Sequence, residues 1–286
     1  MHNKCVVITG ATAGIGLEVL KAIASTGATI VIGARDEARA RNIACDLMRT
    51  TRAIVRVEKL DLGSSDSVRR FVVSFNQLGL TLDILINNAG LMPCPYDEIN
   101  HVDLPFQVNF LSHFLLTEML LPVMANDARV VSVTSEVYRF SYPGGIRFGH
   151  INDAKGYDAV YSYGQSKLAL ILWTWSLSTS LMQSRGVQMF AVHPGSAHTE
   201  GAEKARRSSS GWRGAILRCV GAPFVKTVES AAATIVFCAA HPKAETYALE
   251  GYRYFASCNP RKTTKLAQDS ALARRLVDYA QRACGL

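Results

Sequence analysis

Tyr163 and Lys167 stand four positions apart in the segment Tyr-Gly-Gln-Ser-Lys. That spacing places the phenol and the ammonium on one face of a helix, where they can interact. A nearby cation favours the phenolate, so Lys167 could bring a group with an ordinary pKa of about 10 towards working pH as a general acid or base. Because such a pair also arises by chance, its place after the fifth predicted strand is what favours a catalytic interpretation.

Ser135 is a second candidate, because it ends an apolar run predicted to be a strand at residues 128–134. In open α/β sheets, ligands bind at the carboxyl ends of the strands, where this hydroxyl could meet a reacting oxygen. Serines at strand ends also commonly cap the turn that follows. The residue alone does not separate these two roles.

The segment Thr-Gly-Ala-Thr-Ala-Gly-Ile-Gly, residues 9–16, places three glycines between the first predicted strand and its helix. A tight turn, close backbone approach and exposed helical N–H groups make a cradle for a diphosphate there. The first two glycines are one residue further apart than in GxGxxG, and a structural turn would look similar. The strand-loop-helix context favours the nucleotide site.

Asn-Asn-Ala-Gly at residues 87–90 follows the fourth predicted strand. Carboxamides and a glycine at that edge could hold the adenosine side of a dinucleotide. They could equally stabilise the end of the strand, and both interpretations stay open.

The elements that would position these groups alternate between short apolar strands and helices. Strands are predicted at residues 4–9, 28–34, 53–60, 82–87, 128–134, 187–193 and 252–256. Helices are predicted at residues 15–25, 37–50, 65–78, 159–183, 228–240 and 264–284, with one more ending near residue 124 and with Ser64 or Ser65 as a cap. Continuous apolar strands between helices require a parallel sheet covered on both faces. We therefore predict an α/β fold, a doubly wound parallel sheet of the Rossmann type in one domain over residues 1–286.

Composition limits the class of protein. The 286 residues are 49% hydrophobic and 19% charged, which is typical of a compact globular chain. The seven cysteines are scattered without a CxxC pair, so we expect no metal site and a reducing compartment. The apolar stretch 168–182 is interrupted by serines and threonines and predicts a buried helix rather than a membrane span. No targeting segment is visible, which predicts a cytoplasmic location.

The net charge of +8 is compatible with nucleic acid, an acidic membrane surface or a phosphorylated ligand. Much of the basic character lies in a serine-rich segment that contains Lys204, Arg206, Arg207, Arg213 and Arg218. A solvated loop and a surface-docking segment are alternatives. We favour a substrate lid at about residues 196–226, because apolar side chains such as Trp212 and Phe224 share this segment. No nucleic-acid partner is expected, and weak contact with a membrane surface stays open.

Taken jointly and in order, the motifs resemble the short-chain dehydrogenase/reductase family over nearly the whole chain. The residues that carry the resemblance are Thr9, Gly10, Gly14, Gly16, Asp61, Asn87, Asn88, Ala89, Gly90, Asn109, Ser135, Tyr163, Lys167, Pro194, Gly195 and Thr199.

The resemblance implies a catalytic tetrad. In it, Ser135 polarises the carbonyl or alcohol oxygen and Tyr163 transfers the proton. Lys167 lowers the pKa of Tyr163 and binds the nicotinamide ribose, while Asn109 supports a proton-relay water. The resemblance also implies a nicotinamide dinucleotide held by Gly10, Thr12, Gly14, Ile15, Gly16, Arg35, Asp61, Leu62, Asn88, Ala89, Gly90, Tyr163, Lys167, Pro194, Gly195 and Thr199.

Further details are similar to the retinol dehydrogenase-like branch of that family. They are the segment 106–117, the long separation of Ser135 from Tyr163, and a helix at 230–238 followed by Tyr-Arg-Tyr-Phe. The resemblance implies a lipophilic alcohol, aldehyde or ketone as substrate. The sequence starts directly at the first strand, unlike the membrane-anchored members of the branch, which agrees with the cytoplasmic expectation.

The second strand ends in Gly-Ala-Arg-Asp at residues 33–36, where the choice of cofactor is made. An NAD enzyme needs an acid there for the ribose 2′-hydroxyl, whereas an NADP enzyme needs an arginine for the 2′-phosphate. Arg35 matches the phosphate-binding arginine of the family and Ala34 stands where its selecting acid would be, so we predict NADP(H). Asp36 could instead take the hydroxyl, which would make the chain an NAD-dependent dehydrogenase.

A nucleotide-sensing regulator with the same fold is the rival class. Its signature would be a broken tetrad, and this tetrad is intact. A homo-oligomer stays open.

Overall fold

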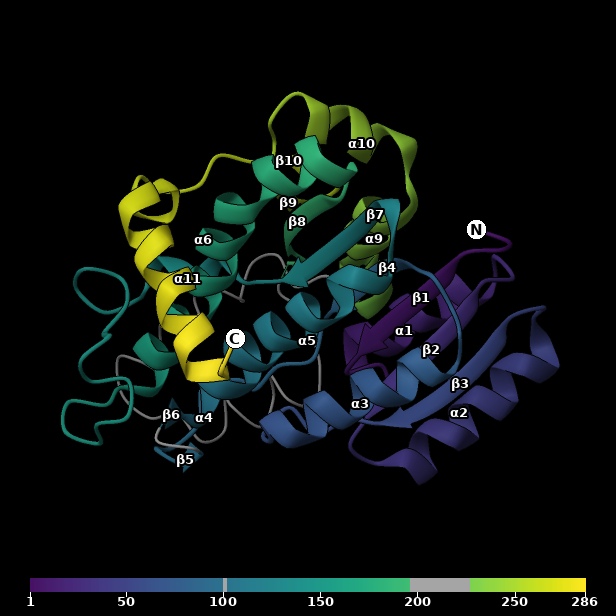
Figure 1. Cartoon of the computed structure of the whole chain (residues 1–286), viewed down its shortest axis with the longest axis horizontal. Coiled ribbons are helices and arrows are strands. Elements are labelled where there is room, and N and C mark those ends of the chain that lie inside the picture. The colour runs from purple at the N-terminus through teal and green to yellow at the C-terminus, as the bar shows by residue number, and fades with distance from the viewer. Residues whose placement is uncertain (100–101, 196–226) are drawn as a thin grey trace.

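A sheet of eight strands forms the centre of the computed structural model, which describes residues 1–99, 102–195 and 227–286 (Figure 1). The strands lie in the order β10-β9-β8-β7-β4-β1-β2-β3, and only the β9–β10 pair is antiparallel. Their bounds are β1 Cys5–Thr9, β2 Thr29–Ala34, β3 Ile54–Lys59, β4 Leu82–Asn87, β7 Met124–Val133, β8 Gln188–His193, β9 Tyr254–Ala256 and β10 Asn259–Pro260. A separate hairpin joins β5 (Glu98–Ile99) to β6 (Val102–Asp103).

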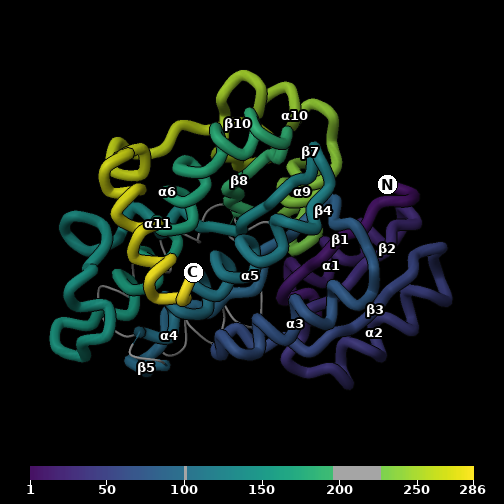
Figure 2. The backbone as a smooth tube through the Cα atoms, in the orientation of Figure 1, coloured from purple at the N-terminus to yellow at the C-terminus, as the bar shows by residue number. Residues whose placement is uncertain are grey.

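Helices cover both faces of this sheet. One face packs against α1 Gly14–Ala24, α2 Glu37–Thr50, α9 Val228–Ala240 and α10 Pro242–Leu249. The other face packs against α3 Ser65–Gln77, α5 Ser112–Leu120, α6 Ala159–Arg185 and α11 Ser270–Cys284. Figure 2 shows the purple and blue strands β2 and β3 at one edge of the sheet and the later strand β8 towards the other. The predicted doubly wound α/β fold is confirmed.

Alternate strand residues supply the two cores. In β1, Val6 and Ile8 pack with α1 and α2, whereas Val7 packs with α3 and α5. In β2, Ile30 packs in the same core as Val6 and Ile8, and Val31 packs in the same core as Val7. Because both faces are covered, no position in these strands needs to be polar, which explains the continuous apolar runs in the sequence.

Side chains at the helix starts explain several boundaries. Ser64 caps α3 by accepting from Ser67 N, as predicted, and Asp36 caps α2 by accepting from Arg39 N. The last helix begins at Ser270 rather than at residue 264, because Asp269 caps it by accepting from Ala271 N and Leu272 N. A side chain that accepts these N–H groups fixes where a helix begins.

The region from 104 to 133 differs most from the prediction. The helix predicted to end near residue 124 is three pieces, α4 Leu104–Phe106, a π-helical turn Gln107–Leu111 and α5, followed by a 3-10 turn Leu121–Val123. Strand β7 then begins at Met124, and its pairing with β4 shifts register between Leu82 and Ile84. The strand was predicted to begin only at residue 128. Asp127 has φ +62° in this stretch, so the first residues of β7 form an irregular strand. Helix α10 was also not predicted.

Helix α6 contains the apolar stretch 168–182 and is buried along much of its length. Across residues 1–99, 102–195 and 227–286, no helix has the length and hydropathy needed to cross a membrane.

Candidate active site

The glycine loop joins β1 to α1 at the point where the strand order reverses between β1 and β4. Gly10 has φ +66°, and a Cβ there would lie 2.6 Å from Ala89 Cα. A Cβ on Gly16 would overlap the Gly10 carbonyl oxygen and Asn88 Nδ2. Both positions therefore require glycine, because the loop is packed directly against the segment that follows β4.

The first turn of α1 fits a diphosphate. Its N-cap residue, Ala13, provides no side-chain hydrogen bond, and the turn holds no acidic residue. No side chain therefore caps the N–H groups of Gly14, Ile15 and Gly16. The helix dipole also favours negative charge at this end of α1. Thr12 is half-buried in the same loop.

Asn88 and Ala89 hold the glycine loop in shape. Asn88 Nδ2 donates to the carbonyl oxygens of Thr9 and Gly10, both at 3.0 Å. The backbone N–H groups of Asn88 and Ala89 donate to Thr9 Oγ1, also at 3.0 Å. The carboxamide of Asn88 therefore shapes the loop that is predicted to hold the dinucleotide.

Tyr163, Lys167 and Ser135 lie together beyond the end of β7. Tyr163 and Lys167 are on α6 and are 6% and 4% exposed. Ser135 hydrogen bonds with the Tyr163 phenol and also caps the turn Glu136–Arg139 by accepting from Val137 N at 3.3 Å. Thr134 Oγ1 donates to the carbonyl oxygen of Lys167 at 2.9 Å and so fixes α6 to this strand. Ser135 therefore caps this turn, and its hydroxyl also lies beside the phenol of Tyr163.

Burial dominates the protonation of this cluster. It raises the pKa of Tyr163 to about 12, and the hydrogen bond with Ser135 only partly opposes the rise. Burial lowers the pKa of Lys167 to about 8. Lys167 Nζ donates to the Val133 carbonyl oxygen at 2.9 Å and lies 5.6 Å from the centroid of the Tyr163 ring. In the protein alone the phenol is thus held protonated, and the lowering expected from Lys167 does not offset burial.

Asn109 lies in the π-helical turn and is completely buried. Its Oδ1 accepts from Leu91 N at 2.7 Å, and its Nδ2 donates to the Leu91 carbonyl oxygen at 3.1 Å and to Ser166 Oγ at 3.0 Å. A Cβ on Gly90 would meet Asn109 Oδ1 at 3.2 Å and Lys167 Nζ at 3.3 Å. Asn109 and Gly90 therefore belong to the same cluster, with the Asn109 carboxamide bonded within the protein.

The remaining predicted cofactor residues lie at other strand ends. Arg35 is exposed directly after β2. Asp61 Oδ1 accepts from Gly63 N at 2.9 Å, and the Leu62 carbonyl oxygen accepts from Ser112 Oγ at 2.5 Å. Pro194 and Gly195, with φ +94° at the glycine, follow β8. Thr199 and the lid predicted at 196–226 lie outside the described residues.

Three residues of this network were missed from the sequence. His113 contacts both Thr9 and Asn109, and Ser166 joins Asn109 to the Tyr163 carbonyl oxygen. Thr134 fixes the helix that carries Lys167. The four-residue spacing from Asn109 to His113 is the one local signal that could have indicated this pairing.

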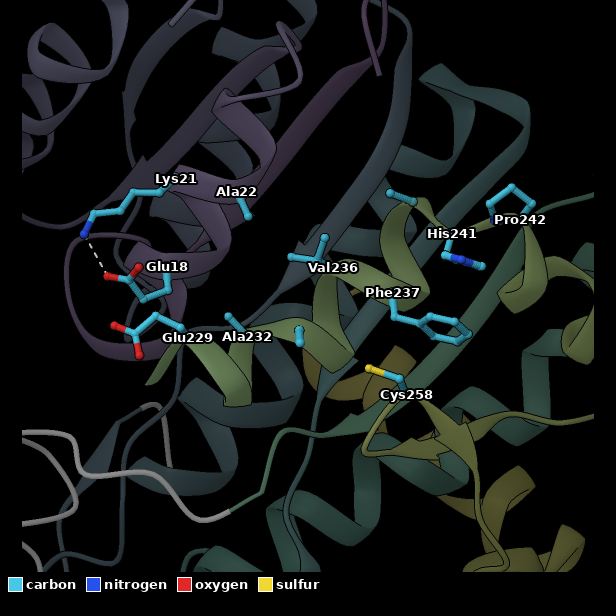
Figure 3. A pocket seen from close by; sticks show the side chains of 12 residues that line it. Glu18, Lys21, Ala22, Glu229, Ala232, Val236, Phe237, His241, Pro242 and Cys258 are labelled. Atoms are coloured by element: carbon cyan, nitrogen blue, oxygen red, sulfur yellow. Dashed lines mark hydrogen bonds and ion pairs between the residues drawn. The ribbon is translucent and has the colours of Figure 1, made fainter. Parts of the chain in front are cut away.

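A cavity of about 810 Å³ lies elsewhere, between α1 and α9 (Figure 3). Ala22, Ala232 and Val236 line its apolar floor, and Lys21 is paired with Glu18 at one end. None of the residues that line it belongs to the tetrad or to the glycine loop. Among the described residues, no group of three His, Cys, Asp or Glu side chains could hold a metal ion.

Comparisons with known proteins agree with this geometry. Residues 4–149 match the family model described as short chain dehydrogenase. Retinol dehydrogenase 12 of Homo sapiens is 36% identical, over 100% of this chain and 88% of its own length. The chloroplastic short-chain dehydrogenase TIC 32 B of Brassica napus is also 36% identical, over 96% of this chain and 86% of its own.

A solved structure of an uncharacterised protein from Mycobacterium paratuberculosis is similar over the whole fold. It is 28% identical with a TM-score of 0.73, and the match covers 99% of this chain and 94% of that one. The glycine loop, the buried Tyr163 and Lys167, and these similarities all indicate the same family. The chain is an oxidoreductase of the short-chain dehydrogenase/reductase family, in its retinol dehydrogenase-like branch.

Proposed function

We propose that this protein transfers a hydride between NADP(H) and a lipophilic alcohol, aldehyde or ketone. The observation that carries the proposal is the group formed by the buried Tyr163 and Lys167 and the half-buried Ser135, with Lys167 Nζ close to Gly90. A sensor without turnover would have no use for a proton donor held beside a buried ammonium, and burial of that ammonium costs folding free energy. The intact cluster therefore favours an enzyme.

Each residue has a defined task in carbonyl reduction. When bound, the cofactor supplies the hydride that the carbonyl carbon accepts. Tyr163 donates its phenolic proton to the carbonyl oxygen, so the carbonyl becomes an alcohol and the phenol becomes a phenolate, which regains a proton from solvent. Ser135 donates a hydrogen bond to the same oxygen, and the Lys167 ammonium, 5.6 Å from the centroid of the Tyr163 ring, favours the developing phenolate. The raised pKa of Tyr163 keeps the proton in place for donation and supports the reductive direction.

Substrate class is tested with the purified protein and NADPH. Rates are measured for paired short-chain and long-chain aldehydes and ketones and for quinones, by loss of NADPH absorbance. We expect turnover that favours the long-chain member of each pair, because an apolar pocket gains free energy from every buried methylene. NADPH binding without turnover of any compound would identify a sensor. Equal rates across chain lengths would contradict a lipophilic substrate.

Two observations at the end of β2 support NADP(H) over NAD(H). The carboxylate of Asp36 is used as the N-cap of α2, accepting from Arg39 N at 3.0 Å. The guanidinium of Arg35 is exposed and makes no hydrogen bond or ion pair with any described residue. Lys59 adds a second cation here, because its Nζ donates to the Arg35 carbonyl oxygen at 2.7 Å. A phosphate fits these charges better than a hydroxyl does.

Arg35→Ser is expected to weaken NADPH binding about 10- to 150-fold, which corresponds to the roughly 1.5–3 kcal/mol of a charge-assisted hydrogen bond. NADH binding should barely change. Dissociation constants are measured by nucleotide fluorescence for both cofactors. Arg41→Ser is the matched control, because Arg41 is also exposed but is paired with Glu37 on α2. Equal losses for both cofactors in Arg35→Ser would point to Asp36 and an NAD enzyme.

The proposal extends to location and partners. The cysteines at 5, 45, 94, 238, 258 and 284 are free thiols, which suits a reducing compartment and supports a cytoplasmic location. The partner that we propose is a small lipophilic molecule and not a nucleic acid.

A further inference from the structure

His113 occupies a buried position between the cofactor loop and the catalytic helix. It lies on α5 and is 1% exposed. Its Nε2 lies 3.0 Å from Thr9 Oγ1, at the start of the glycine loop, and its Nδ1 lies 3.1 Å from the carbonyl oxygen of Asn109. The proposed mechanism uses none of the atoms of this ring.

The hydrogen bonds around Thr9 determine the tautomer of His113. Thr9 Oγ1 already accepts two N–H donors, from Asn88 and Ala89, and a hydroxyl has two lone pairs and one proton. The Thr9 hydroxyl must therefore donate its proton to Nε2, which is unprotonated. Nδ1 carries the ring proton and donates it to the Asn109 carbonyl oxygen, which can only accept. Burial lowers the pKa of His113 to about 4, in agreement with a neutral ring.

The chain of hydrogen bonds continues from Asn109 to the catalytic helix. Asn109 Nδ2 donates to Ser166 Oγ at 3.0 Å, and Ser166 Oγ donates to the Tyr163 carbonyl oxygen at 2.7 Å. Thr9, Asn109 and Ser166 are all completely buried. Water therefore does not compete for these bonds, and their geometry is stiff.

We propose that His113 is a positioning residue that fixes the distance between the cofactor loop and Tyr163. The inference rests on the proposed function and adds a residue to that same site. The imidazole ring is rigid, with an acceptor, Nε2, on one edge and a donor, Nδ1, on another. By binding Thr9 and Asn109 at the same time, it fixes the distance between them. A phenylalanine ring of similar size would span the same gap but would hold neither group.

The test compares His113→Phe with the wild type. We expect the dissociation constant for NADPH to rise about 10-fold and kcat to fall about 100-fold, since a shift near 1 Å in the reacting groups has an effect of that size. NADPH binding is measured by fluorescence titration, and kcat with the best substrate of the carbonyl panel. His113→Gln, whose amide oxygen can accept from Thr9, should recover part of the NADPH affinity.

Phe114→Leu is the matched control for a merely structural role. Phe114 is the next residue on α5, is completely buried, and packs against Phe110 and Trp173. It should lower the melting temperature while NADPH affinity and kcat, measured below that temperature, stay at wild-type values. If His113→Phe behaves like Phe114→Leu in both readouts, the proposal is wrong.

Thr9→Val and Thr9→Ser supply a second arm, and the comparison of these two variants does not depend on His113→Phe being well folded. Thr9→Val removes the hydroxyl that His113 accepts from, whereas Thr9→Ser keeps that hydroxyl and should bind NADPH nearly as the wild type does. In the Thr9→Val background, His113→Phe should add little further loss of NADPH affinity, because the two residues act as one unit. Losses that multiply would overturn the proposal. NADPH binding is read without substrate, so this arm stays decisive even if no carbonyl compound is turned over.

Discussion

Tyr163→Phe is expected to lower kcat by about 10²- to 10⁴-fold, the contribution that a positioned proton donor makes. NADPH affinity should stay near the wild-type value, because the ring and its contact with Lys167 remain. The phenolic oxygen is the only atom removed, and its hydrogen bond is with Ser135. Single-turnover measurements with excess NADPH separate the chemical step from binding.

Tyr161→Phe is the matched control for this variant. Tyr161 lies two residues earlier on α6, and its ring packs against Tyr142. It should retain the wild-type kcat. If Tyr163→Phe kept most of the rate, the proton would have to come from another group, and the role assigned to Tyr163 would be lost.

Lys167→Met is expected to reduce both kcat and NADPH affinity by more than 10-fold, because the ammonium is proposed to stabilise the phenolate and to bind the cofactor ribose. Lys21→Met, on the exposed face of α1, controls for the loss of one positive charge and should leave both quantities unchanged. A variant of Lys167 that kept its NADPH affinity would remove the ribose contact from the proposal.

The same variant has an opposite effect on stability. Burial lowers the pKa of Lys167 from 10.5 to about 8, so the folded state opposes the charge that the unfolded state carries. Below pH 8 the cost of burying the charged ammonium is on the order of 3 kcal/mol of folding free energy. This cost falls as the pH rises towards 10.5 and is absent above it. The free energy of unfolding of Lys167→Met should therefore exceed that of the wild type near pH 7, less about 1 kcal/mol for the lost bond to Val133. Denaturant titrations from pH 7 to 10 should show the gap closing, and a constant gap would contradict the assignment.

Local signals explain why most of the fold could be predicted from the sequence. Uninterrupted apolar runs such as Val6 to Ile8 occur where both faces of a strand are covered, and caps such as Asp36 and Ser64 mark where helices begin. The irregular start of β7 could not be predicted, because pairing with β4 holds a sequence that locally favours a turn.

Several residues that the sequence singled out lie together in the structure, whereas their contacts could not be predicted. The spacing of Tyr163 and Lys167 indicates one helical face, whereas the bond from Lys167 Nζ to Val133 depends on how α6 crosses the sheet. His113 shows the same limit, since its partner Thr9 is 104 residues away in the chain. Burial decided the pKa of Tyr163, and burial is a property of the assembled fold.

The dependence of the glycine loop on Asn88 has a consequence for the order of folding. The hydrogen bonds that shape the loop span 78 to 80 residues of chain, so they cannot form while a growing polypeptide ends before β4. Until then β1 lacks its β4 neighbour, and the carbonyl groups of Thr9 and Gly10 face water. Long-range closure of this kind is slow compared with the formation of a single helix. A bound nucleotide can therefore stabilise only chains in which β4 has already paired with β1. It stabilises the fold after the sheet has formed and does not direct the formation of the sheet.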